Sequence, residues 1–199
     1  MHTRPGPPRR ADARRNAERI VRVAIDALGE GGGPVRLEEL ADRAGVAEAT
    51  LYRLFGGRRG LMTEVLATFV TEQIEPLVGP PGPDPTAELA TALAATVEVL
   101  AEHRALVRAA REAGPLGVGP VQGFLGRLAA VLAAAQEAGG VRPDATVRDL
   151  GAVLIMALAA VHEGDPAGAD RRRALALLLA GLRPGGPPLP PPAPGNLLA

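Results

Sequence analysis

The stretch Val35–Leu61, VRLEELADRAGVAEATLYRLFGGRRGL, decides the fold of this 199-residue chain. Leu37, Leu40 and Ala41 recur at the spacing of one helix face, which predicts a helix over about residues 36–44. Gly45 can adopt the left-handed backbone that a sharp turn requires. We therefore expect two short helices joined at Gly45, with the small Ala41 where they approach closely.

The helix after this turn has two unlike faces. It is predicted over about Glu48–Phe55, with Leu51, Leu54 and Phe55 on one apolar side. The side chains of its other face are small or polar: Ala47, Glu48, Ala49, Thr50, Tyr52 and Arg53. A helix with an apolar back and a short polar front can enter the major groove of DNA, so the pair is predicted to be a helix-turn-helix.

This stretch resembles the tetracycline-repressor (TetR) family of regulators, over about residues 12–68. The matching elements are Leu40–Ala41, Ala44–Gly45–Val46, Thr50–Leu51–Tyr52, Phe55, a following basic residue and Leu61. The resemblance implies that Thr50 and Tyr52 face DNA, with Tyr52 on a phosphate. It also implies that Arg58, where the family usually has Lys, holds phosphate at the start of the fourth helix.

Two positions depart from the family pattern. The family commonly has Thr or Ser where Arg36 stands, and often Ser where Ala47 stands; losing such a helix cap typically costs about 1 kcal/mol. Arg36 can replace the phosphate contact but not the cap. Glu48 can accept from a cytosine amino group, although an acid at a helix start is also favoured by the dipole alone. The residues expected to contact DNA are Arg14, Arg15, Arg36, Ala47, Glu48, Ala49, Thr50, Tyr52, Arg53 and Arg58.

The whole chain is predicted to be all-α, with about nine helices and no strand pattern. Aromatic residues make up only 2% of it, so the core must be built from Leu, Ala and Val, which favours helices. The expected parts are a disordered basic arm over residues 1–10, a helix-turn-helix domain over 11–58, a helical effector-binding and dimerisation domain over 59–183, and a disordered Pro-rich tail over 184–199. The arm either reaches DNA or serves as a solubilising tail.

Composition excludes several classes of protein. The chain has no Cys and three His, so no metal site and no cofactor are predicted. No catalytic triad, phosphate loop or carboxylate pair stands out, which argues against an enzyme. The longest apolar run, Leu150 to Val161, is shorter than the roughly 20 residues of a membrane span. Without a targeting segment, a cytoplasmic location is expected.

Charge is unevenly distributed. Residues 1–62 hold 12 Arg against 8 acidic residues, whereas the rest holds 10 Arg against 14. A basic N-terminal part beside an acidic body suits a chain that touches a polyanion with one end only.

The helices predicted at Ala145–His162 and Ala167–Leu182 are apolar on more than one face, which in a small protein implies a partner or an internal core position. The resemblance implies that the last two helices of each subunit form a four-helix interface. The residues assigned to it are Val153, Ile155, Leu158, Leu175, Leu178, Leu179 and Leu182. An effector pocket is expected among the central helices, although ordinary core also fits its members. They are Leu93, Val97, Leu100, Val107, Phe124, Leu128 and Met156, with Arg104, Arg108 and Gln122 as polar groups.

The resulting prediction is a homodimeric, ligand-responsive transcriptional repressor. It would bind a double-stranded palindromic operator and release it when a small molecule binds the C-terminal domain. The alternative is a helical small-molecule or protein-binding module with the same fold and no sequence-specific DNA binding.

Overall fold

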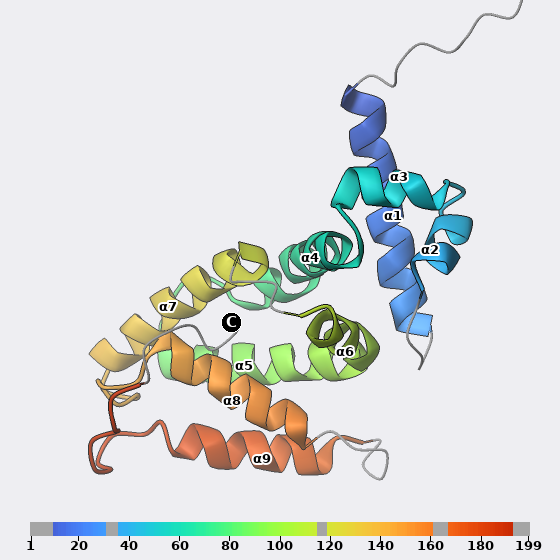
Figure 1. Ribbon diagram of the computed structural model, residues 1–199. Coiled ribbons are helices and arrows are strands. Elements are labelled where there is room, and N and C mark those ends of the chain that lie inside the picture. Colours follow the sequence, from blue (N-terminus) through green and yellow to red (C-terminus); the bar gives the residue numbers. More distant parts are fainter. Residues whose placement is uncertain (1–9, 31–35, 115–118, 161–166, 193–199) are drawn as a thin grey trace, which may run out of the picture. The chain divides into compact units, whose positions relative to one another are not determined.

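The computed structural model describes residues 10–30, 36–114, 119–160 and 167–192, and this part of the chain is all-helical (Figure 1). It contains nine α-helices, which confirms the predicted fold class. They are α1 (Arg10–Glu30), α2 (Leu37–Arg43), α3 (Glu48–Phe55), α4 (Arg58–Phe69), α5 (Pro85–Glu102), α6 (Arg104–Glu112), α7 (Gln122–Glu137), α8 (Val147–Ala159) and α9 (Ala169–Ala180). A π-helical turn η1 (Val70–Ile74) continues α4, and two 3-10 turns, η2 (Glu75–Leu77) and η3 (Gly119–Val121), follow. None of the described helices combines the length and apolarity needed to span a bilayer.

The helices form two compact units. The first comprises the described residues up to Thr68 together with Ala105–Gly114; the second comprises those of Phe69–Arg104 and Pro115–Ala199. The sequence predicted a boundary after residue 58, whereas α4 up to Thr68 and most of α6 group with the N-terminal helices. The predicted arm over residues 1–10 lies outside the described residues, apart from Arg10.

The first unit is built on the apolar stripe of α1. Ile20 and Ala24 are fully buried, at 0% exposure, and α2 packs against α1 on one side and α3 on the other. Leu40 of α2 and Leu51 of α3 are also buried. Burying a side chain of this size stabilises the fold by about 1.5–3 kcal/mol, so the stripe fixes where α2 and α3 lie.

The second unit is centred on α5, which contacts α7, α8 and α9. Leu93 of α5, Leu128 of α7 and Leu150 of α8 are each 0% exposed. Local bonds define where α5 begins: the Asp84 side chain accepts from the backbone N–H of Ala87 at 3.0 Å, and Pro85 follows directly. These bonds set the register of α5 in the core.

An ion pair joins α9 to α5. Arg171 donates through Nε to Glu98 Oε1 at 3.2 Å, and the Arg171 side chain is only 12% exposed. Because Glu98 lies near the end of α5 and Arg171 near the start of α9, the two helices run antiparallel. Figure 1 shows α9 lying along α8, which also contacts it closely.

The segment Pro184–Pro192 is held by the loop between α7 and α8. Arg142 donates to Asp144 through Nε at 2.5 Å and Nη2 at 2.9 Å, and also to the carbonyl of Pro187. The backbone N–H of Leu189 donates to Asp144 Oδ2 at 2.8 Å. We call these four residues the Arg142 clasp.

The clasp departs from the disordered tail predicted over residues 184–199. Composition shows that a Pro-rich segment cannot form a helix, but it does not show that a distant Arg–Asp pair offers partners for its backbone. Residues 193–199 lie outside the described residues.

Candidate nucleic-acid interface

The turn between α2 and α3 is built on Gly45, as the sequence predicted. Its φ is +62°, a left-handed value that glycine adopts without strain. The N–H of Gly45 donates to the carbonyl of Asp42, and the N–H of Val46 donates to that of Ala41, each at 3.0 Å. These bonds use carbonyls at the end of α2 and turn the chain directly into α3.

The helix α3 starts without a side-chain cap. Ala47 has the extended geometry of an N-cap, with φ −70° and ψ 143°, but its methyl group accepts no hydrogen bond. Arg36 likewise provides no cap for α2. The structure thus agrees with the absence of caps inferred from the departures from the family pattern.

Two glycines position the far end of α3. The helix ends at Gly56, whose φ is +71°, and Gly57 follows with φ +110°. A Cβ built on Gly57 would lie 3.4 Å from Cε1 of Tyr52, so the tyrosine ring covers this glycine. At Gly60 a Cβ would lie only 1.7 Å from the carbonyl oxygen of Phe55. The start of α4 therefore approaches the end of α3 at a distance that only glycine permits.

The two faces of α3 differ as predicted. Leu51 is 1% exposed and anchors the back of the helix, while Leu54 and Phe55 are half-buried. Tyr52 is 54% exposed, and Thr50 is half-buried. The other outward residues are all exposed: Ala47, Glu48, Ala49 and Arg53. Tyr52 and Arg53 are the large groups on this face, and the ring of Tyr52 lies against Gly57.

The predicted arginines lie on three further elements. Arg14 and Arg15 lie in the first turns of α1, where Arg14 pairs with Glu18 at 3.3 Å and Arg15 pairs with Asp12. All four side chains are substantially exposed, and such pairs contribute only about 0.3–0.5 kcal/mol. They are therefore weak enough to be exchanged for phosphate. Arg36 is exposed before α2, and Arg58 is half-buried at the start of α4.

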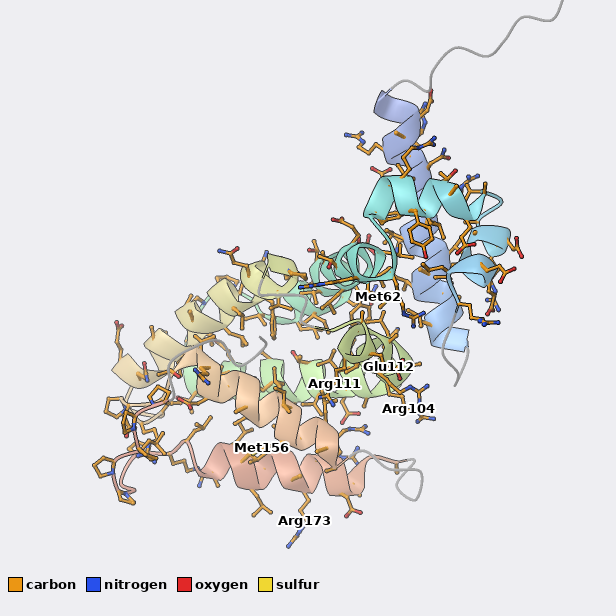
Figure 2. The ribbon with its side chains drawn as sticks, viewed as in Figure 1. Met62, Arg104, Arg111, Glu112, Met156 and Arg173 are labelled. Atoms are coloured by element: carbon orange, nitrogen blue, oxygen red, sulfur yellow. The ribbon has the colours of Figure 1, made fainter. Side chains whose placement is uncertain are left out.

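The residues predicted for the effector pocket differ in how deeply they are buried. Four of them are buried core residues: Leu93, Val97, Phe124 and Leu128. Leu100 and Val107 are half-buried, whereas Arg104, Arg108 and Gln122 are exposed. Figure 2 labels Arg104 at the start of α6, and Val107 and Arg108 belong to the first compact unit. The sequence pattern showed which positions are apolar, but core and pocket lining share that pattern.

Met156, also predicted as a pocket residue, is the most exposed large apolar side chain among them. It is 49% exposed on α8 (Figure 2). On α9, Leu177 is 66% exposed and was missed by the sequence reasoning. The signal was present, because Leu177 is two positions, about 200° of helix, from the buried Leu175 and so faces the opposite way.

The predicted interface residues of α8 and α9 divide into two groups. Val153, Leu175 and Leu182 are buried within the chain. Ile155, Leu158, Leu178 and Leu179 are half-buried. The first group is internal core. Of the second, Leu179 lines a cavity together with Leu89 of α5, whereas the other three leave apolar surface on the helices that carry Met156 and Leu177.

Two family models match the chain. Residues 20–65 match the model described as bacterial regulatory proteins, tetR family, and residues 84–184 match the model described as transcriptional regulator SbtR-like, C-terminal domain. The chain belongs to the TetR family. TetR-family proteins are transcriptional regulators with a helix-turn-helix DNA-binding domain and are not enzymes, which confirms these two predictions.

Solved structures agree with this assignment. A TetR regulatory protein from Mycobacterium vanbaalenii is 31% identical, with 88% of this chain and 99% of that chain covered and a TM-score of 0.54. A TetR regulator from Rhodococcus sp. RHA1 is 25% identical, with 85% and 97% covered and a TM-score of 0.57. FadR from Bacillus subtilis, in complex with stearoyl-CoA, shares the fold at 17% identity, with 83% and 99% covered and a TM-score of 0.56. A comparison with curated proteins gives no match.

Proposed function

We propose that this TetR-family protein is a homodimeric repressor that holds a palindromic operator and releases it when a small molecule binds its C-terminal domain. The observation that carries the proposal is the geometry of α3. Leu51 is buried behind the helix, and Tyr52 is 54% exposed in front of it. A short helix locked from behind in this way can lie in a major groove without rearranging.

Phosphate contacts supply most of the affinity in this proposal. The hydroxyl of Tyr52 and the guanidinium of Arg58 are donors suited to phosphate oxygens, and Arg14, Arg15 and Arg36 add charge. Base reading is limited to Glu48, Thr50 and Arg53, because Ala47 and Ala49 offer only methyl groups. Binding should therefore fall steeply as salt concentration rises.

The apolar surface on α8 and α9 supports a twofold dimer. Met156 and Leu177 are exposed there beside half-buried leucines and Ile155. Two such helix pairs packed together would bury this surface and give the twofold symmetry that a palindrome requires. The two copies of α3 would then reach successive major grooves, about 34–36 Å apart.

An apolar effector fits the composition of the second unit. FadR holds stearoyl-CoA, and KstR2 of Mycobacterium tuberculosis, also similar in fold, is called a ketosteroid regulator. We propose an apolar ligand of the second unit that favours a state in which the α3 helices no longer match the groove spacing.

The test is a fluorescence-anisotropy titration of the dimer against its upstream intergenic DNA at several salt concentrations. Tyr52→Ala and Arg58→Ala should each weaken binding by about five- to tenfold, because each removes one phosphate donor. The matched control is Arg127→Ala, which removes an exposed arginine on α7. Variants that bind like the parent would contradict the proposal.

A second candidate function is a helical binding module that does not read DNA sequence. The lack of side-chain caps at Ala47 and Arg36 favours it, because α3 then begins without the usual support. The same titration separates the two functions. A salt-dependent shift of equal strength on operator and scrambled DNA supports the module, whereas a preference for the operator supports the repressor.

A further inference from the structure

A cavity of about 280 Å³ lies in the second unit where α5 begins and α9 ends. Leu89 of α5, Leu179 of α9 and Val141 of the α7–α8 loop line it, and Leu182 and Arg183 close its C-terminal side. None of the residues predicted for the effector pocket is among its lining residues. Cavities of about 150 Å³ lined by aliphatic side chains already hold a molecule the size of benzene, so this space suffices for a short aliphatic chain.

Part of the wall of this cavity is buried and hydrogen-bonded. Leu89, Val141 and Leu182 are all less than a tenth exposed. The backbone N–H of Arg142 donates to the carbonyl of Leu182 at 2.9 Å, which joins the wall from the α7–α8 loop to the wall from α9. The Arg142 clasp holds the same loop from its other side. The buried part of the wall is therefore held by packing and a backbone bond, while the exposed residues Ala176, Ala180 and Arg183 leave the cavity open to solvent on one side.

The two arginines at this end of the unit differ in their partners. Arg142 is 8% exposed and donates to both carboxylate oxygens of Asp144 and to the carbonyl of Pro187. Arg183 lines the cavity and is exposed, and within the described part of the chain its guanidinium makes no ion pair or hydrogen bond. The cavity therefore offers aliphatic walls and one available cation, the arrangement that suits an apolar chain with an anionic head.

We propose that this cavity is a binding site for a short aliphatic carboxylate. The chain lies against Leu89, Val141 and Leu179, and the carboxylate pairs with Arg183. The site is separate from the effector pocket of the proposed function and does not depend on it.

Methyl NMR of the full chain, labelled on Leu and Val methyls, tests the site directly with hexanoate and 1-hexanol as probes. Hexanoate should shift the methyl signals of Leu89, Val141 and Leu179 saturably, with a dissociation constant on the order of 1 mM. The alcohol should bind at least threefold more weakly, and Arg183→Gln should abolish that preference. No saturable shift up to about 20 mM would overturn the proposal. Shifts confined to Leu93 and Leu128 would overturn it too, because they would place the probe in the predicted effector pocket.

A filling variant gives an independent check. Ala176 lines the cavity from α9 and is exposed, so Ala176→Trp can occupy the space without disturbing the core. Hexanoate binding should fall at least tenfold, while Ala129→Trp, on the exposed side of α7 and away from the cavity lining, should bind like the parent. Ala180→Trp is a second filling variant of the same wall. Equal hexanoate binding by a filling variant and the parent would show that the probe does not occupy this cavity.

Discussion

The surface of the helix-turn-helix comes from one short stretch of sequence, whereas the cavity of the C-terminal body (the second unit) comes from segments far apart in the chain. In the first, Gly45, Leu51, Tyr52 and Gly57 all lie within Val35–Leu61, and each fixes the geometry of a close neighbour. In the body, the cavity combines the start of α5, the α7–α8 loop and the end of α9. Local sequence patterns therefore decide a surface made from one stretch, whereas a surface made from three segments depends on how those segments pack.

The largest effect on stability should come from a substitution in the core of the second unit. Leu128, for which the sequence left pocket lining and ordinary core open, is 0% exposed, so Leu128→Ala should lower the free energy of unfolding by about 2–5 kcal/mol. Leu128→Met is the matched control and should cost less than about 1.5 kcal/mol. Urea denaturation followed by circular dichroism measures both. A cost below about 1 kcal/mol for the alanine variant would mean that the side chain borders a hollow, as the sequence prediction had it.

Two Gly→Ala substitutions, one in each region, should change the free energy of unfolding in opposite directions. At Gly60 the new methyl would meet the carbonyl oxygen of Phe55 at 1.7 Å, and the backbone must move, at a cost of about 1–3 kcal/mol or more. At Gly126, inside α7, no atom lies within 4 Å of the new methyl, so alanine should stabilise the helix by about 0.5–1 kcal/mol.

Thermal unfolding and operator titration distinguish these two variants. Gly60→Ala should also weaken operator binding, because α3 shifts with the start of α4. Gly126→Ala should bind operator like the parent. An unchanged melting temperature for Gly60→Ala would show that this junction is looser than its geometry indicates.

The sequence predicted α3 to the residue, over Glu48–Phe55, because an alanine after a turn and a glycine pair bracket its apolar face. It predicted α8 over Ala145–His162, whereas the helix runs over Val147–Ala159. The start moved because Thr146 and Asp149 form a capping box, which apolar periodicity does not show.

The candidate sites also differ in how well the sequence predicts them. The exposed positions of Glu48, Tyr52 and Arg53 agree with the predicted outward face of α3, since 100° per residue and one buried leucine are enough to orient a short helix, whereas Thr50 is half-buried. The cavity beside Arg183 and the Arg142 clasp were missed. Each depends on residues from segments far apart in the chain, and a single sequence gives no signal for such pairs.

The two units also differ in helix capping, and substitutions at the caps should have smaller effects on stability. Ala47 has N-cap geometry without a cap, so Ala47→Ser should stabilise the first unit by about 1 kcal/mol. Thr146→Ala removes a working capping box and should destabilise the second unit by a similar amount. Differential scanning calorimetry of both variants checks the two signs. If Thr146→Ala stabilises the protein, or if Ala47→Ser has no effect, side-chain caps do not determine the stability of these two helix starts.

The smallest predicted effect is the loss of folding stability at acid pH through the Arg142 clasp. The hydrogen bond from Arg142, together with that from the backbone of Leu189, holds the pKa of Asp144 well below its usual range. Because the folded pKa is the lower one, this carboxylate contributes stability above the ordinary pKa of about 3.9 and loses it as pH falls below that value. The Asp144 side chain is 35% exposed, so water screens the pair and the contribution stays small.

The difference in urea midpoint between the parent and Asp144→Asn should therefore be constant from about pH 7 to pH 5 and shrink towards pH 3. If it is instead the same at all three pH values, the pairing seen between Asp144 and Arg142 does not stabilise the folded state through its charge. The clasp would then hold the Pro184–Pro192 segment by the hydrogen bonds that Arg142 donates to the carbonyl of Pro187 and that Leu189 donates to the side chain at position 144, and the asparagine side chain can still accept the second of these.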